Sequence, residues 1–116
     1  MLPKQYRLKK RSAFKATYKV RNSSHSGGVT LFAGILKKED NPTKVGFVVS
    51  KKVHKRAVKR NRLKRLMRES YRLLLKENQL GNSQKYMSLI FVGTENAMTK
   101  SFDEIQNSIK KLIERI

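Results

Sequence analysis

The segment from Lys51 to Arg72 constrains the fold most, because its charge and its hydrophobicity follow one helical pattern. It holds eleven Lys or Arg residues and a single acid, Glu69. On a helical wheel of about 100° per residue, the stretch at about 57–75 separates into two arcs. The nearly apolar arc comprises Leu63, Leu66, Met67, Ser70, Leu73 and Leu74, and the basic arc comprises Asn61, Arg62, Lys64, Arg65, Arg68, Glu69 and Arg72. This pattern predicts a long helix with one face in the core and the other free for a ligand.

The rest of the charge is just as uneven. The 116 residues include 28 Lys or Arg and 8 Asp or Glu, a formal net charge of +20. A second basic zone, from Lys4 to Arg21, has eight cations and no acid, and the two zones carry nearly all of the excess. Charges that served solubility alone would be spread out and mixed in sign. The clustering therefore predicts a binding surface for an anionic partner, and nucleic acid fits such a basic stripe.

Composition excludes several classes of protein. Without cysteine the chain has no disulfide framework, no thiolate zinc site and no cysteine nucleophile. The first ten residues lack the apolar stretch of a signal peptide, and no run approaches the ~20 apolar residues of a membrane span, so a cytoplasmic protein is expected. Membrane-surface helices usually place large aromatics opposite their basic face. The basic segment here offers mainly Leu and Met, which a core uses equally well, so neither a membrane partner nor a small-molecule substrate is expected.

Periodicity and turn residues predict one domain, residues 1–116, of the α+β class, an α-β-β-α-β-α sandwich. Ser12 is expected to cap the first helix, and Ser101 with Glu104 the last. Residues 22–28 are expected to form a flexible loop. The expected elements are a helix at about 12–21, a β-hairpin at about 29–50, the basic helix at about 57–75, a strand at 86–92 and a helix at 102–116. Both faces of the strands are largely apolar, so the sheet needs cover on both sides or keeps one face for a ligand.

The Arg60-Asn61-Arg62 run carries recognisable chemistry. Each guanidinium can hold phosphate oxygens in a bidentate fork, and the amide can donate and accept at once. This combination suits the backbone of a folded RNA.

In its context the run resembles a known family, the bacterial ribonuclease P protein subunit. The resemblance rests on Val49-Ser-Lys-Lys52 followed by Ala57-Val-Lys-Arg-Asn-Arg-Leu-Lys-Arg65, and on Arg7-Leu-Lys-Lys10 followed by Phe14 and Tyr18. It covers about Tyr6 to Ile116. Many members carry a glycine before Ala57, where His54-Lys55-Arg56 stand here. The resemblance implies a mixed sheet packed by helices, with a left-handed crossover between parallel strands, against the usual right-handed preference.

The resemblance also implies a division of labour. A partner RNA, with magnesium, removes the five-prime leader of precursor tRNA, and the protein binds both RNAs without catalytic residues or metal ligands of its own. Magnesium would be bound mainly by the RNA. The residues expected on the catalytic RNA are Arg56, Lys59, Arg60, Asn61, Arg62, Lys64, Arg65 and Arg68. Those expected on the leader are Lys10, Phe14, Tyr18, Phe32, Lys51 and Lys52.

Three alternatives remain open from the residues alone. Phe14 and Tyr18 could simply pack the first helix on the sheet, although aromatic faces also stack on unpaired bases of any sequence. A self-sufficient nuclease would need acid–base or metal-binding groups, but its candidates are poor: Asp103 and Glu104 fit a helix cap, Glu39 and Asp40 fit a turn, and His25 and His54 lie alone in expected loops. A ribosomal or DNA-binding protein is the third alternative. A DNA reader contacts base edges, whereas a stripe this dense in Lys and Arg suits phosphates.

Overall fold

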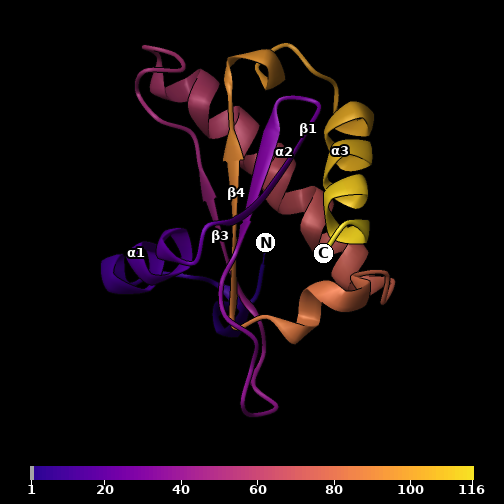
Figure 1. The fold of residues 1–116 in the computed structure, drawn as a ribbon. Helices are drawn as coiled ribbons and strands as arrows, with labels where there is room; N and C mark the ends of the chain where they lie inside the picture. The colour runs from indigo at the N-terminus through magenta and orange to yellow at the C-terminus, as the bar shows by residue number, and fades with distance from the viewer. Residues whose placement is uncertain (1) are drawn as a thin grey trace.

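The computed structural model describes residues 2–116, which form a mixed α+β fold, as expected (Figure 1). Three short 3-10 helices also occur, η1 (Lys4–Tyr6), η2 (Gly81–Lys85) and η3 (Glu95–Ala97). The main elements are α1 (Arg11–Lys19), β1 (Asn22–Ser26), β2 (Val29–Ala33), β3 (Lys44–Val48), α2 (Ala57–Lys76), β4 (Ser88–Gly93) and α3 (Phe102–Glu114). The basic helix, the third expected strand and the C-terminal helix are thus confirmed to within a few residues.

The sheet has the strand order β1-β2-β4-β3. β2 pairs antiparallel with β1 and with β4, while β3 pairs parallel with β4. The expected hairpin between residues 29–36 and 44–50 is therefore wrong, because β4 lies between the two strands. With apolar residues on both faces, β2 occupies an interior position, where it has a partner on each side.

The expected loop at 22–28 is also wrong, because most of it forms β1. Gly27 and Gly28 have φ of 56° and 85°, the positive values that a two-residue hairpin turn demands. They bring Ser26 opposite Val29. The strand is polar because it lies at the edge of the sheet, and so the alternation of apolar and polar residues that marks other strands is missing.

The first helix begins differently from the expectation. Lys10 occupies the N-cap without a side-chain cap bond, and Ser12 lies inside the first turn. Arg21 has φ of 61°, a left-handed conformation that turns the chain from α1 into β1. The last helix begins as expected: Ser101 accepts the Glu104 backbone N–H, and Glu104 accepts the Ser101 N–H.

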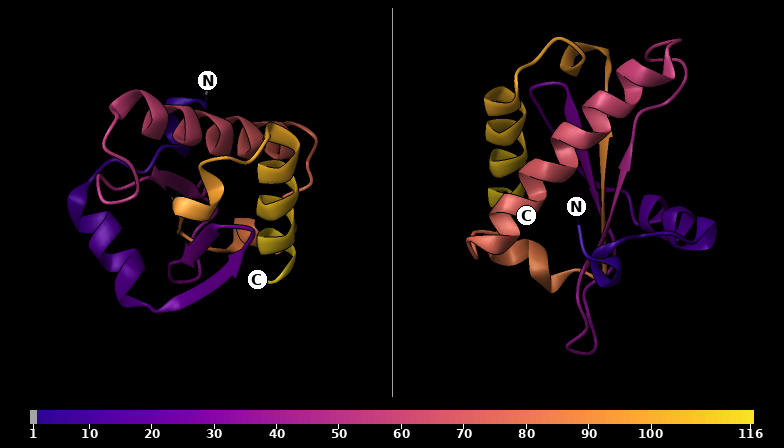
Figure 2. Two further views of the ribbon diagram at one scale, coloured as in Figure 1. Left: turned by 90° about the horizontal axis from the view of Figure 1, so that it is seen from above. Right: turned by 180° about the vertical axis from the view of Figure 1, so that it is seen from behind.

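Helices cover both faces of the sheet, with α2 and α3 on one side and α1 on the other (Figures 1 and 2). In the right-hand view of Figure 2, α2 lies in front of the sheet as the chain passes from β3 on the right to β4 on the left. This is the left-handed crossover that the resemblance implied.

The core lies between the sheet and the α2–α3 pair. Leu63, Met67 and Leu74 are buried there, as the wheel predicts. Tyr71, which the apolar arc did not include, is fully buried; its ring lies 5.8 Å from Phe91 and 6.2 Å from Phe47. This packing fixes the rotation of α2, so that its basic arc faces outward.

Candidate nucleic-acid interface

The face of the sheet opposite α2 and α3 is built from two rows of side chains. Strand register aligns the first row as Ser23, Phe32, Ile90 and Gly46, and the second row as His25, Thr30, Val92 and Val48. Helix α1 covers the first row, in which Ile90 is fully buried. The second row stays partly accessible: Thr30, Val48 and Val92 are half-buried, and His25 is exposed. We call this second row the open strip.

Three contacts fix α1 on this face of the sheet, two with the first row and one with Ser88 beside it. The Phe14 ring lies over Gly46, where an added Cβ would be only 2.6 Å from two ring carbons. Tyr18 packs edge-to-face on Phe32, with ring centroids 4.9 Å apart. The buried Thr17 hydroxyl donates to the Ala13 carbonyl at 2.8 Å and accepts from the Ser88 hydroxyl at 2.6 Å. The sequence signal for this docking was Gly46, since glycine inside a strand often marks a close approach.

The three aromatics predicted to bind the leader therefore lie together and also pack α1. Packing does not bury them completely, since Tyr18 is 36% exposed and Phe14 and Phe32 are half-buried. Partial burial raises the pKa of Tyr18. Of the predicted lysines, Lys10 is exposed at the start of α1, and Lys51 and Lys52 are exposed just beyond β3. α1, which covers the first row, and the 49–56 connection, which follows β3, thus flank the open strip.

The histidines also take defined places. His25 lies in β1, not in a loop, and its Nδ1 is 2.8 Å from the Thr30 hydroxyl. His54 lies in the 49–56 connection, where its Nδ1 accepts the Arg56 backbone N–H at 3.0 Å. No residue from 51 to 56 has a positive φ. The connection therefore turns without the glycine that many members carry.

The basic arc of α2 faces away from the core. Arg56, Lys59, Asn61 and Arg65 are exposed, and Arg62, Lys64 and Arg68 are half-buried. A surface cavity of about 330 Å³ runs along the first turns of the helix, lined by Val58, Lys59, Asn61, Arg62 and Arg65. These side chains can reach a phosphate backbone lying along the helix.

Arg60 is the exception among the predicted contacts. Its Nη1 donates to the carbonyl oxygens of His54 and Lys55, each at 2.8 Å. The guanidinium is thereby tied to the 49–56 connection, although its Nε and Nη2 remain available for other acceptors. Wheel geometry could not foresee this contact, because it involves residues before the helix.

The cations of both zones are largely free of acidic partners. Residues 2–116 contain two ion pairs, Arg72 with Glu69 and Lys100 with Glu104. The Arg72 Nε lies 3.1 Å from both carboxylate oxygens of Glu69, and this hydrogen bonding lowers the pKa of Glu69 and raises that of Arg72. None of the cations predicted to contact the catalytic RNA has an acidic partner of this kind. Such a surface is suited to an anion supplied from outside.

Two further features bear on chemistry. Within residues 2–116, no three His, Asp or Glu side chains gather closely enough to hold a metal ion. Over the same part of the chain, every helix is too short or too polar to cross a membrane.

Comparison with known proteins gives a consistent result. The family model described as Ribonuclease P matches residues 2–116. A ribonuclease P protein component of Clostridium kluyveri is 38% identical over 110 residues, which cover 95% of this chain and 93% of that protein. One from Synechococcus is 35% identical over 120 residues, covering 99% and 84%. The solved RNase P protein of Staphylococcus aureus superposes with a TM-score of 0.79 at 27% identity, over 97% and 95% of the two chains. That of Thermotoga maritima, at 21% identity and a TM-score of 0.77, shares the fold.

Proposed function

Since the chain belongs to the ribonuclease P protein component family, whose general role is in tRNA processing, we propose that it is the protein cofactor of a catalytic RNA. In this proposal the protein binds the catalytic RNA and the five-prime leader of precursor tRNA at the same time. The RNA cleaves the precursor to give the mature five-prime end. In this proposal magnesium binds mainly to the RNA.

The observation that carries the proposal is the array of cations on α2 without acidic partners. Solvated basic helices usually interleave Glu with Lys at i, i+4 for local stabilisation. Here the one acid among the cations, Glu69, is held by Arg72. Repulsion among the remaining cations destabilises the free protein, and a phosphate backbone relieves it. The predicted contacts of α2 are therefore retained as the catalytic-RNA surface, with Arg60 also shaping the connection before it.

The leader surface in this proposal combines the open strip with Phe14, Tyr18 and Phe32. Their accessible aromatic faces can stack on unpaired bases whatever the sequence, and Lys10, Lys51 and Lys52 flank them to hold phosphates. Such a surface allows precursors with many different leaders to share one binding mode.

The proposal is tested by reconstitution. The purified protein with precursor tRNA and magnesium should not cleave, and adding the catalytic RNA should produce cleavage at the mature five-prime end. Site-specific cleavage by the protein alone would overturn the assignment of catalysis to RNA. Structured RNA and leader-bearing precursor should also outcompete duplex DNA at matched salt, and equal affinity for all three would contradict the proposal.

A pair of arginine variants tests the α2 surface. Arg65→Ala should weaken binding of the catalytic RNA and lower the slope of log affinity against log salt by about one. Arg72→Ala is the matched control, because it removes the same charge from the same helix at a side chain already paired with Glu69. Equal losses in the two variants would mean that net charge, and not this surface, drives binding.

A further inference from the structure

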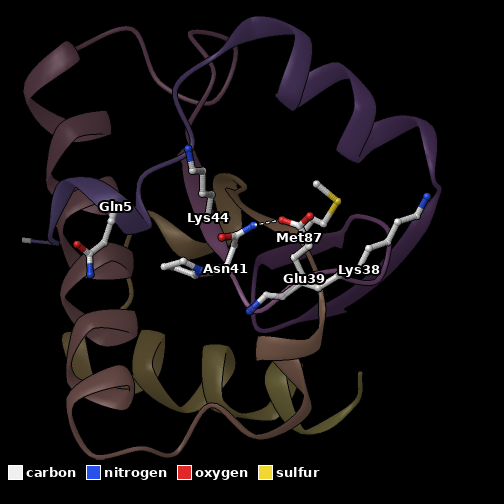
Figure 3. Close-up of a pocket in the computed structure, with 8 residues that line it drawn as sticks. Gln5, Lys38, Glu39, Asn41, Lys44 and Met87 are labelled. Atoms are coloured by element: carbon white, nitrogen blue, oxygen red, sulfur yellow. Dashed lines mark hydrogen bonds between the residues drawn. The ribbon is translucent and has the colours of Figure 1, made fainter.

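A second surface cavity lies at the opposite end of the sheet from the 49–56 connection. It has a volume of about 600 Å³ and opens between η1 and the segment of residues 34–43, which we call the arm (Figure 3). Its lining includes Gln5, Lys37, Lys38, Asn41, Lys44 and Met87. None of these residues belongs to the catalytic-RNA or leader surfaces proposed above. We call the cavity the arm pocket.

Backbone contacts hold the arm in place. The Lys37 N–H donates to the Lys85 carbonyl, and the Met87 N–H donates to the Ile35 carbonyl, both at 2.8 Å. At the other end of the arm, the buried Thr43 hydroxyl lies 2.7 Å from the Tyr86 carbonyl, to which it donates. Both ends of the arm are therefore anchored to the segment that leads into β4.

The pocket is positively charged. Lys37, Lys38 and Lys44 line it, and none of them takes part in the ion pairs of residues 2–116. Glu39 is the one acid of the lining, and its Oε2 accepts from the Asn41 side-chain amide at 3.3 Å (Figure 3). The lysine ammonium groups thus remain available for an anion.

Apolar surface lies beside these lysines. Met87 and Pro42 line the pocket, and Met87 is 50% exposed. Single exposed apolar residues are ordinary, but the pairing of the arm with residues 85–87 also brings Ile35, which is 53% exposed, beside Met87. An apolar wall next to free ammonium groups matches a nucleotide, with its flat base and its phosphate. The amides of Gln5 and Asn41 can donate to and accept from a base edge.

The pocket continues the surface that Phe14 occupies. Lys44 and Gly46 point to the same face of β3, two residues or about 6.6 Å apart, and the Phe14 ring covers Gly46. That step is comparable with the spacing of successive phosphates in an extended single strand. Lys51 and Lys52 lie at the other end of β3, beside the start of α2. Because α1 lies across the sheet between the open strip and Lys44, a leader that starts at α2 passes over α1 and reaches the arm pocket with its nucleotides farthest from the catalytic RNA.

We propose that the arm pocket binds an unpaired nucleotide of the precursor leader, upstream of those that stack on Phe14 and Tyr18. Its phosphate is held by the arm lysines Lys37 and Lys38, with Lys44 on the opposite side of the pocket, and its base lies against Met87 and Pro42. This inference rests on the proposed function, because it extends the same leader surface. A second copy of the chain is a poor occupant, since two molecules of net charge +20 repel each other.

The test measures affinity for precursor tRNAs whose leaders are lengthened one nucleotide at a time, with the protein assembled on its catalytic RNA. The variant is Lys37→Ala with Lys38→Ala. The matched control is Lys110→Ala with Lys111→Ala, which removes the same charge from exposed positions of α3. The wild type and the control should gain affinity as the leader grows past Phe14 to the arm pocket. The arm variant should match the wild type for short leaders and lose the gain for long ones.

Salt dependence gives a second readout. Each lost phosphate contact lowers the slope of log affinity against log salt by about 0.7–0.9, so between about 50 and 200 mM salt the long-leader complex of the arm variant should weaken roughly threefold less than that of the wild type. Met87→Ala should weaken long leaders while leaving the slope unchanged.

The outcomes separate this inference from the proposed function. An arm variant that keeps the full gain with leader length, or a control pair that loses as much, would overturn the inference alone. A wild type that binds precursor and mature tRNA equally would overturn the proposed function, and the inference with it.

Discussion

Gly46→Ala tests whether the Phe14 ring is seated on the sheet as the structure has it. The new Cβ would lie 2.6 Å from Cε1 and Cζ of Phe14 and 3.5 Å from Cβ of Leu8. The ring must therefore retreat by roughly 0.8 Å to regain an ordinary contact of 3.4 Å, an overpacking that typically costs about 1–3 kcal/mol of unfolding free energy. Because α1 is anchored by Thr17 on Ser88 close by, the helix cannot simply slide away.

The displaced ring should also bind the leader less well. Losing one aromatic stacking contact costs about 1–3 kcal/mol, or about 5- to 150-fold in affinity. Urea unfolding should show the lower stability, and binding of precursor against mature tRNA should show the reduced discrimination. The control is Gly93→Ala, whose Cβ would lie 2.6 Å from Leu63 Cδ2 on the opposite face of the sheet. It should lower stability similarly but leave the discrimination intact.

A double-mutant cycle completes this test. Phe14→Leu should remove much of the cost of Gly46→Ala, because the smaller side chain vacates the space, so the two changes should be strongly non-additive in unfolding free energy. Additive effects, or a Gly46→Ala protein as stable as the wild type, would refute the placement of the ring. Loss of discrimination in Gly93→Ala to the same extent would show that stability, and not Phe14, controls leader binding.

Three other predictions concern single side chains. Burial raises the pKa of Tyr71 to about 12, so the folded state keeps a proton that the unfolded chain loses near pH 10. The unfolding free energy should therefore fall by about 2 kcal/mol between pH 10 and 12, and Tyr71→Phe should abolish that component in urea unfolding. Ser101→Ala removes the cap of α3 and should cost about 1 kcal/mol in thermal unfolding, whereas no change would mean that the cap bond is dispensable. Arg60→Ala should speed amide hydrogen exchange at residues 51–56, which Arg65→Ala should leave unchanged; equal exchange in both would dismiss the contacts of Arg60 with the connection.

The elements that could be predicted are those specified by residues close together in the sequence. α2 and α3 show apolar residues at helical spacing, and Ser101 with Glu104 marks where α3 begins. β1 could not be predicted because Asn22–Ser26 is polar throughout; its state depends on the Gly27-Gly28 turn and on pairing with β2. The order of the strands was missed for a related reason. The placement of β4 between β2 and β3 is decided by packing across residues distant in the chain, which no local pattern records.

The site divides in the same way. The helical wheel correctly predicted that the cations of α2 face outward, because the apolar arc on the opposite side of the helix is buried in the core. It could not show that Arg60 reaches back to the carbonyls of His54 and Lys55, since that depends on how the 49–56 connection folds. The sequence indicated that the sheet could keep one face for a ligand, but not which residues form the open strip, because these come from all four strands.

The first turn of α2 joins the stability of the protein to its proposed role. A helix N-terminus carries partial positive charge and favours acids, yet this turn contains no acid and lies among Arg56, Lys59 and Arg60. The free protein tolerates this because Leu63, Met67 and Tyr71 pack the helix against the sheet. The Arg60 guanidinium also donates hydrogen bonds to two backbone carbonyl oxygens, those of His54 and Lys55. A phosphate backbone along this turn would face both the helix dipole and the cations. The cations of this first turn therefore destabilise α2 in the free protein and favour binding of RNA. RNA binding should stabilise the folded protein by neutralising the repulsion among these cations.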